Sequence, residues 1–156
     1  MEEHSSITAN FQRIGSESNS QVGMDFETAV NDFLTKQGLS LTKHYQVPIG
    51  IAEKKKMHMF DFGSNNPKVI VECKSHRWTT GDNTPSAKMT TWNEAMYLFA
   101  IAPQEYRKIF VVLKDFNERR RQTLAEYYIK TYEHLIPVDV KILEFDTNAN
   151  NGIQLK

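Results

Sequence analysis

Two acidic residues interrupt apolar stretches of this 156-residue chain, and together with a nearby lysine they could support hydrolysis. Asp61 lies between two phenylalanines, and Glu72 follows a Val-Ile-Val run. An ionised carboxylate in an apolar strand is costly unless it is paired or binds a metal ion. Because side chains alternate along a strand, Glu72 and Lys74 should share a face, while Cys73 points to the other. Two carboxylates and one ammonium group are therefore candidates for one site.

Such a set of groups suits the hydrolysis of phosphodiester bonds. Carboxylate oxygens bind hard divalent cations, which polarise a phosphate and lower the pKa of a bound water. The ammonium group of Lys74 could contact the attacking water or the phosphate, and its charge would reduce repulsion between the two acids. The alternative is a buried structural ion pair between Lys74 and one acid, which would leave the other acid uncompensated.

The two acids lie on predicted strands that would form a hairpin. Residues 57–62 and 68–74 have the composition of strands, and Gly63-Ser64-Asn65-Asn66-Pro67 indicates the turn between them. With that turn, Asp61 and Glu72 become direct neighbours only if the strand register is offset or bulged.

The other elements follow from hydrophobic periodicity and from capping and turn residues. We expect a helix ending near Gly38, a strand over 39–51 interrupted at Pro48, a helix with Thr84 as N-cap and Pro85 at its first position, a strand over 108–113 buried on both faces, a helix opened by Arg119-Arg120-Arg121 and ended by Pro137, and a strand over 138–145. The order α-β-β-β-α-β-α-β predicts an α/β fold with a mixed central sheet flanked by helices. We expect a flexible N-terminal arm at 1–22, one domain over 23–146, and a polar, frayed tail at 147–156.

The composition adds few restrictions. The chain has 19 Lys and Arg and 19 Asp and Glu, so its formal net charge is zero, which neither favours nor excludes nucleic acid. A single cysteine, Cys73, excludes an intramolecular disulfide and a paired-cysteine zinc site. Because the sequence has no signal-peptide pattern at its start and no apolar run of membrane-spanning length, we expect a cytoplasmic protein.

Phe60-Asp61, a gap of ten residues and then Glu72-Cys73-Lys74 resemble the motif of the PD-(D/E)xK nuclease superfamily. That group includes restriction endonucleases, Holliday-junction resolvases and repair nucleases. The resemblance spans roughly residues 23–113, including the family's order of helix, three-stranded meander, helix and strand. The chain departs from the motif at Phe60, where the family has proline. The resemblance implies a restriction-endonuclease-like core.

The resemblance also implies a role for each motif residue. Asp61 and Glu72 would be metal-ligating carboxylates, Cys73 would offer its backbone carbonyl to the metal, and Lys74 would be the catalytic lysine. The metal would be Mg²⁺, with Mn²⁺ as a substitute. Glu27 on the first helix would be a further catalytic glutamate, although negative charge in a helix's first turn is favoured by the helix dipole in any case.

Further residues could contact nucleic acid, and each has a plain alternative. His76 shares the predicted face of Glu72 and could contact phosphate or water, or it could be a strand-end histidine in solvent. Trp78 could stack on a base or wedge a duplex, or it could be a packing residue. Basic residues that could bind the phosphate backbone are also typical of a solvated surface: Lys54, Lys55, Lys56, Arg77, Lys88, Arg119, Arg120 and Arg121.

The leading hypothesis is a Mg²⁺-dependent endodeoxyribonuclease of a restriction, mobile-element or junction and repair type. Cleavage of both strands of DNA would favour a homodimer, because one site cuts one strand. One alternative is a non-catalytic nucleic-acid-binding module on the same fold. Another is a structural or protein-binding domain, which leaves Asp61, Glu72 and Lys74 without a joint explanation.

Overall fold

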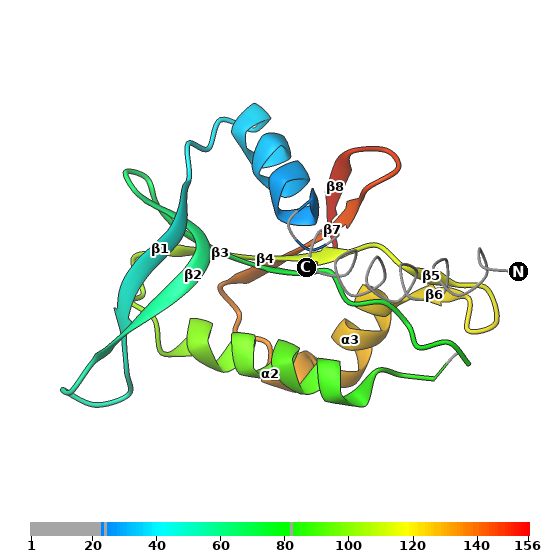
Figure 1. Ribbon diagram of the computed structural model, residues 1–156. Helices are drawn as coiled ribbons and strands as arrows, with labels where there is room; N and C mark the ends of the chain where they lie inside the picture. Colours follow the sequence, from blue (N-terminus) through cyan, green and yellow to red (C-terminus); the bar gives the residue numbers. More distant parts are fainter. Residues whose placement is uncertain (1–22, 24, 82) are drawn as a thin grey trace, which may run out of the picture.

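The computed structural model describes residues 23, 25–81 and 83–156 (Figure 1). These residues form a six-stranded mixed sheet in the order β1-β2-β3-β4-β7-β8. The β3–β4 and β4–β7 pairs are parallel, and the β1–β2, β2–β3 and β7–β8 pairs are antiparallel. The strands are β1 (Thr42–Ile49), β2 (Lys56–Asn65), β3 (Lys68–Lys74), β4 (Arg107–Leu113), β7 (Val140–Asp146) and β8 (Asn151–Gln154). The prediction of a mixed α/β protein is confirmed.

Helices cover both faces of this sheet. A helix over residues 25–36, which we call the N-terminal helix, lies on one face, whereas α2 (Ser86–Ala100) and α3 (Leu124–Tyr132) lie on the other (Figure 1). A 3₁₀ helix, η1 (Glu133–Leu135), follows α3. None of the helices among the described residues is both long enough and apolar enough to cross a membrane.

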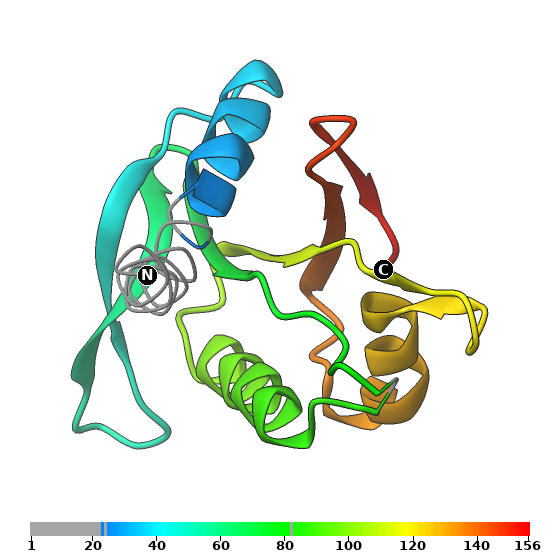
Figure 2. The same ribbon diagram turned by 45° about the vertical axis from the view of Figure 1, so that its right-hand side comes forward.

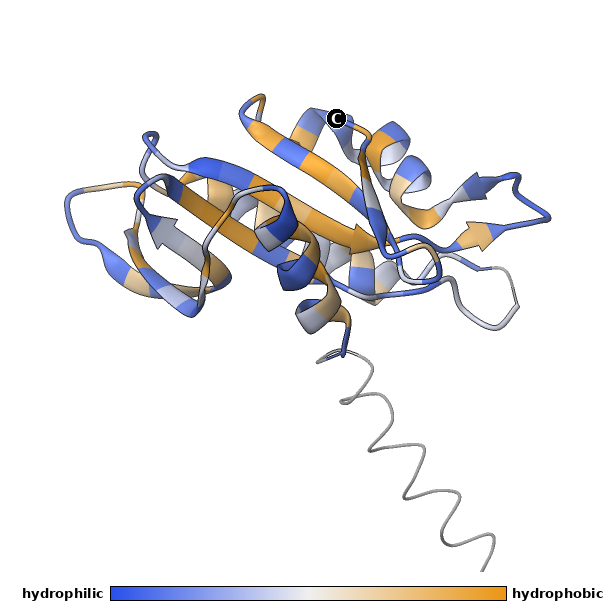
Figure 3. Cartoon of the chain, turned by 90° about the horizontal axis from the view of Figure 1, so that it is seen from above, coloured by the Kyte–Doolittle hydropathy of each residue, from blue (hydrophilic) through white to orange (hydrophobic). Residues whose placement is uncertain are grey.

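Each face of the sheet packs its own hydrophobic core. Val69 and Val71 pack with the N-terminal helix, whereas Ile70 packs with α2 and α3. In β4, residues 108–113 are all buried, which confirms the expected strand covered on both faces. Figure 3 shows these central strands as the most continuous hydrophobic stretch of the chain.

The predicted element order is wrong around the three arginines. Arg119, Arg120 and Arg121 do not open a helix; they lie in the turn of a small hairpin, β5 (Phe116–Asn117) with β6 (Gln122–Thr123), and α3 begins only at Leu124. The side chain of Thr123 accepts the backbone N–H of Glu126, whose carboxylate accepts the N–H of Thr123. This reciprocal capping box satisfies two otherwise unpaired donors, which fixes the helix start at Thr123.

The predicted order also lacks the last strand. The segment expected to be a frayed tail contains β8, which pairs with β7 from Leu143–Gln154 to Asp146–Asn151. This pairing covers an edge of β7 that would otherwise expose unpaired backbone groups. The proposed arm at 1–22 lies outside the described residues.

Two smaller boundaries also differ from the prediction. Pro48 does not interrupt β1, because β1 is an edge strand on which a missing N–H can face away from the sheet. Helix α2 begins at Ser86 with Pro85, not Thr84, as N-cap, and no side chain caps it. The predicted apolar stripe of α2 is nevertheless buried: Met89, Trp92, Met96 and Phe99.

Candidate active site

The register of β2 against β3 brings the two acids together. Strand β2 continues through Gly63 to Asn65, so the turn is shorter than predicted and Phe62 pairs with Val71. The pairing ends there, and the next residues along the two strands are Asp61 and Glu72, whose charges interact. The expected start of the turn is wrong, because Gly63 belongs to the strand and not to the turn. A Cβ at Gly63 would overlap the ring of Tyr45, which explains a glycine inside this strand.

Both strands of the β1–β2 hairpin change faces at this point. Phe60 packs in the core beside α2, whereas Phe62 packs in the core beside the N-terminal helix, although regular alternation would put both on one face. The pairing of β1 with β2 skips His44 and Asp61, and His44 has a left-handed backbone with φ of 57°. Asp61 therefore lies at a local twist, where β2 and β3 separate.

The carboxylate of Asp61 accepts a backbone hydrogen bond from β3 at the point where β2 and β3 stop pairing. Its Oδ2 accepts the backbone N–H of Cys73 at 2.7 Å. Strand pairing between β2 and β3 ends at Phe62 and Val71, so the carboxylate takes the place of a strand carbonyl. Burial raises the pKa of Asp61, while the hydrogen bond from Cys73 and the charge of Lys74 oppose that rise. Cys73 itself is buried on the side of the N-terminal helix, as predicted.

Glu72 is held in a poorly solvated position with one oxygen unsatisfied. Its Oε1 lies 3.6 Å from Nζ of Lys74, so the two side chains lie close together as predicted. Its Oε2 is buried and has no hydrogen-bond partner among the described residues. Burial, followed by the nearby charge of Asp61, raises the pKa of Glu72 to about 7. The single lysine thus compensates the two acids only in part.

Glu27 approaches the same place from the N-terminal helix. It is half-buried, and its carboxylate lies 3.9 Å from Nζ of Lys43 on β1. Burial raises the pKa of Glu27, and the charge of Asp61 raises it further. Asp61 and Lys74 therefore act electrostatically on both Glu27 and Glu72, which gathers these groups around one end of β3.

Sequence reasoning missed His58, which lies beside these acids. Its Nε2 is buried without a hydrogen-bond partner in the described part of the chain, and its ring packs edge-on against Phe60 at 4.6 Å. Burial lowers the pKa of His58, whereas the charges of Glu94 on α2 and of Asp61 raise it. The signal was its position two residues before Phe60 on the same strand, which predicts a shared buried face.

His76 does not lie free in solvent. It is half-buried, and its Nδ1 accepts the indole N–H of Trp92 at 2.8 Å. Burial lowers the pKa of His76 to about 4, and the charges of Lys88 and Lys74 act in the same direction. Because Nδ1 is the acceptor, the neutral ring carries its proton on Nε2, so His76 is a neutral donor within the electrostatic reach of Lys74.

Trp78 is a packing residue in this structure. Its backbone N–H and its indole N–H donate to Oδ2 and the carbonyl of Asp115 at 2.8 and 2.9 Å. The guanidinium of Arg120 lies 5.0 Å from the centre of its ring, and Tyr127 packs edge-on against it. These contacts fix the segment that follows β3, so the indole is not presented for stacking on a base.

The basic residues fall into two separate groups. Lys54, Lys55 and Lys56 lie at the tip of the β1–β2 hairpin, away from the acids, and Lys55 donates to the carbonyl of Gly50 at 2.7 Å (Figure 1). Arg77, Lys88 and the three arginines of the β5–β6 turn belong to segments that follow β3. In this second group, Arg77 lies 3.6 Å from Asp115 and Arg121 lies 3.5 Å from Glu118, whereas Arg119 and Arg120 help to line a hollow of about 370 Å³ with Gly81 and Asn83.

No three His, Cys, Asp or Glu side chains among the described residues lie close enough to hold a metal ion by themselves. A cation at this site would therefore rest on Asp61, Glu72, a backbone carbonyl and outside oxygens. Comparison of the chain with models of known protein families, with curated proteins and with solved structures found no match.

Proposed function

We propose that this chain is a metal-dependent endodeoxyribonuclease of the PD-(D/E)xK type with a restriction-endonuclease-like core, acting in the cytoplasm. One observation carries the proposal: Glu72 is largely buried near Asp61, its buried Oε2 has no hydrogen-bond partner among the described residues, and its pKa is raised to about 7. Two crowded carboxylates that share one lysine are poorly stabilised alone. A divalent cation would remove that electrostatic cost.

The donor set fits Mg²⁺ better than a softer metal. Asp61 and Glu72 offer carboxylate oxygens, and the backbone carbonyl of Cys73 is the third candidate ligand. Mg²⁺ is typically bound through one or two carboxylates, with water and substrate phosphate completing its shell. A set of only two carboxylates therefore agrees with the lack of a three-ligand cluster among the described side chains. Mn²⁺ would serve as a substitute.

Each residue of the site has a defined task in this proposal. When bound, the cation lowers the pKa of a water molecule and neutralises charge on the phosphate. Lys74, held 3.6 Å from Glu72, supplies a positive charge to the attacking water or to a phosphate oxygen. Asp61 is oriented by the N–H of Cys73, and Glu27 adds a further acid from the N-terminal helix. His76 can donate its Nε2 proton to a phosphate oxygen without carrying charge.

DNA would reach this site over the segments that follow β3. Arg77, Lys88 and Arg119 are exposed basic residues of those segments and are candidates for phosphate contacts. The β5–β6 hairpin that carries Arg119 projects from the body of the protein (Figure 2). A homodimer would place two such sites on one duplex and allow both strands to be cut.

A second candidate function is favoured by two contacts. Asp61 caps a backbone N–H and Glu72 pairs with Lys74, which are also the contacts of a purely structural network in a non-catalytic nucleic-acid-binding module. The nuclease and the non-catalytic module differ in how Glu72 affects the stability of the metal-free protein. A network residue stabilises the fold, whereas a metal ligand buried without its cation destabilises it.

The test is a nicking assay joined to thermal melts. The purified chain is incubated with supercoiled plasmid and with branched DNA, in Mg²⁺ and in excess chelator. Cleavage in Mg²⁺ that the chelator and Glu72→Gln both abolish would support the nuclease. Cleavage that persists in chelator would refute the metal mechanism. No cleavage, together with a large loss of stability in Glu72→Gln, would favour the structural network.

A further inference from the structure

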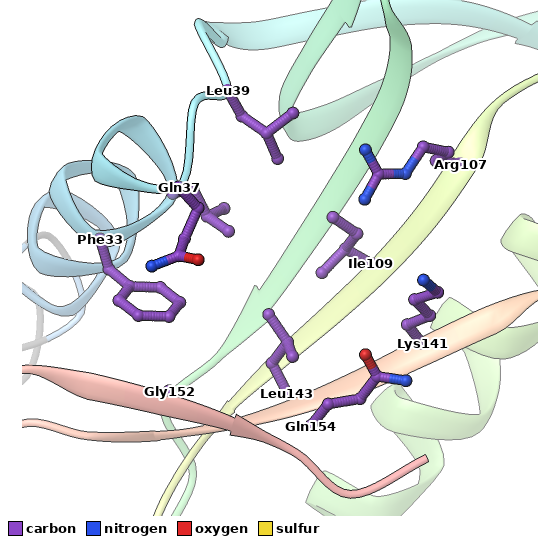
Figure 4. Close-up of a pocket in the computed structure, with 10 residues that line it drawn as sticks. Phe33, Gln37, Leu39, Arg107, Ile109, Lys141, Leu143, Gly152 and Gln154 are labelled. Carbon is purple, nitrogen blue, oxygen red and sulfur yellow. The ribbon is translucent and has the colours of Figure 1, made fainter.

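A pocket at the other end of the sheet carries two cations and no acid. Figure 4 shows it between the N-terminal helix, the start of β4 and the β7–β8 hairpin, with a volume of about 340 Å³. Arg107 in the pocket pairs with Val69, whereas Lys74 pairs with Val112. At about 3.3 Å per residue, that difference along the strands separates the pocket from Lys74 by roughly 17 Å. The pocket is therefore distinct from the proposed active site.

Arg107 and Lys141 supply the positive charge of this pocket. They lie on the neighbouring strands β4 and β7, and Ile109, which shares a strand face with Arg107, pairs with Lys141 (Figure 4). Both cations are exposed, and neither has an ion-pair partner within the described part of the chain. An anion in the pocket could therefore pair with both side chains without displacing an acid of the described chain.

The rest of the pocket offers apolar surface and amide groups. The side chains of Gln37 and Gln154 lie on opposite sides of the opening and can donate hydrogen bonds (Figure 4). Gly152 allows the ring of Phe33 to lie against the backbone of β8, because a Cβ there would meet that ring at 2.9 Å. The apolar wall consists of Phe33, Leu34, Leu39, Ile109 and Leu143.

We propose that this pocket binds a small organic anion in which a phosphate or carboxylate is attached to an apolar, ring-sized body. The anionic group would pair with the guanidinium of Arg107 and the ammonium of Lys141, which form strong charge-assisted hydrogen bonds. The apolar body would lie against Phe33 and Leu143. The volume is within the range of small-molecule sites, roughly 300–1,000 Å³. This inference does not depend on the proposed nuclease activity.

The test is a titration of the isotope-labelled full chain followed by amide NMR. Phenyl phosphate and benzoate are the two probes, and inorganic phosphate and phenol are the controls that lack the apolar body or the charge. We expect saturable shifts at Gly152 and at the side-chain amides of Gln37 and Gln154. Inorganic phosphate and phenol should bind at least roughly tenfold more weakly, because each makes half of the contacts.

Matched variants show whether the two cations are responsible. The double variant Arg107→Gln, Lys141→Gln should weaken binding of the better probe by at least roughly tenfold. Lys130→Gln, which removes an exposed lysine from α3 on the other face, should leave it unchanged. Binding of phenyl phosphate alone would identify a phosphomonoester site, and binding of benzoate alone a carboxylate site.

Four results would overturn the proposal. The first is the absence of a saturable shift with either probe. The second is equal binding of inorganic phosphate or phenol. The third is shifts confined to residues around Glu72. The fourth is an unchanged affinity in a folded double variant. Because the wild-type titration alone distinguishes the first three outcomes, the test remains decisive even if the double variant does not fold.

Discussion

The two ends of the parallel strands carry opposite, unbalanced charge in different surroundings. At the far end of β3, two acids share one lysine, and Glu72 is largely buried. At the near ends of β4 and β7, Arg107 and Lys141 line one pocket that no acid lines, but both are exposed. Water screens the exposed cations more strongly than the largely buried acids. Unbalanced charge should therefore change the free energy of unfolding strongly at the acidic end and only slightly at the basic end.

The largest expected effect is on cleavage at the acidic end. If the proposed nuclease mechanism holds, Asp61→Ala, Glu72→Gln and Lys74→Ala should each lower plasmid nicking by about two or more orders of magnitude, because each removes a proposed metal ligand or the proposed catalytic lysine. Lys74→Ala should largely retain metal binding, since both carboxylates remain. Glu53→Gln, an exposed acid in the β1–β2 loop, is the control and should cut normally. Normal nicking by Glu72→Gln would remove Glu72 from the site.

The next effect is a pH-dependent gain of stability in Glu72→Gln without metal. The pKa of Glu72 rises from an ordinary value of 4.5 to about 7 in the folded state, so its protonated form is favoured there. The free energy of unfolding is therefore highest below pH 4.5 and falls as the pH rises through 7, by on the order of 3 kcal/mol. Denaturant melts in chelator at pH 5 and pH 8 measure this slope. The variant should flatten it; a steeper slope or a strong loss of stability would favour a structural ion pair.

Gly63→Ala should lower the stability of the fold, by an amount smaller than or similar to the pH-dependent effect of Glu72. The added Cβ overlaps the ring of Tyr45, and overpacking of this kind typically costs about 1–3 kcal/mol. Nicking should fall as well, because Gly63 sets the register that places Asp61 near Glu72. The double variant Gly63→Ala, Tyr45→Ala separates the two effects, since removing the ring should restore space for the Cβ. If the single variant melts like the parent, the close approach of Tyr45 is not needed.

The smallest effect is expected at the basic end. Arg107→Gln should change the free energy of unfolding by less than about 0.5 kcal/mol, because the charge that it removes is exposed and screened. Chemical denaturation at low and at moderate salt measures this difference. A change as large as that of Glu72→Gln would show that burial does not distinguish the two ends.

Hydrophobic pattern predicted the parts of this molecule that packing controls. The buried strand over 108–113, the stripe on α2 and the shared face of Glu72 and Lys74 all follow from periodicity, which the structure confirms. The errors fall where one contact outweighs local sequence preference. Gly63 resembles a turn residue, yet the ring of Tyr45 from another strand requires a glycine there.

The candidate site could likewise be predicted from the sequence only in part. The positions of Asp61 and Glu72 could be predicted because an acid between apolar residues is conspicuous in a sequence. The change of face at His44 could not, because no residue type there demands a left-handed backbone. Trp78 was ambiguous for a similar reason: its two bonds to Asp115 join residues that are 37 positions apart.

The change of face in the β1–β2 hairpin separates two parts of the chain that can vary independently. The position of Asp61 is set by the pairs from Phe62 to Asn65 with β3, on the inner side of the twist. Residues 50–55 at the hairpin tip lie beyond it and are mostly exposed. The tip could therefore be lengthened, shortened or exchanged for a different loop without moving the acids. It is the natural graft point for anyone who wishes to change what this protein binds.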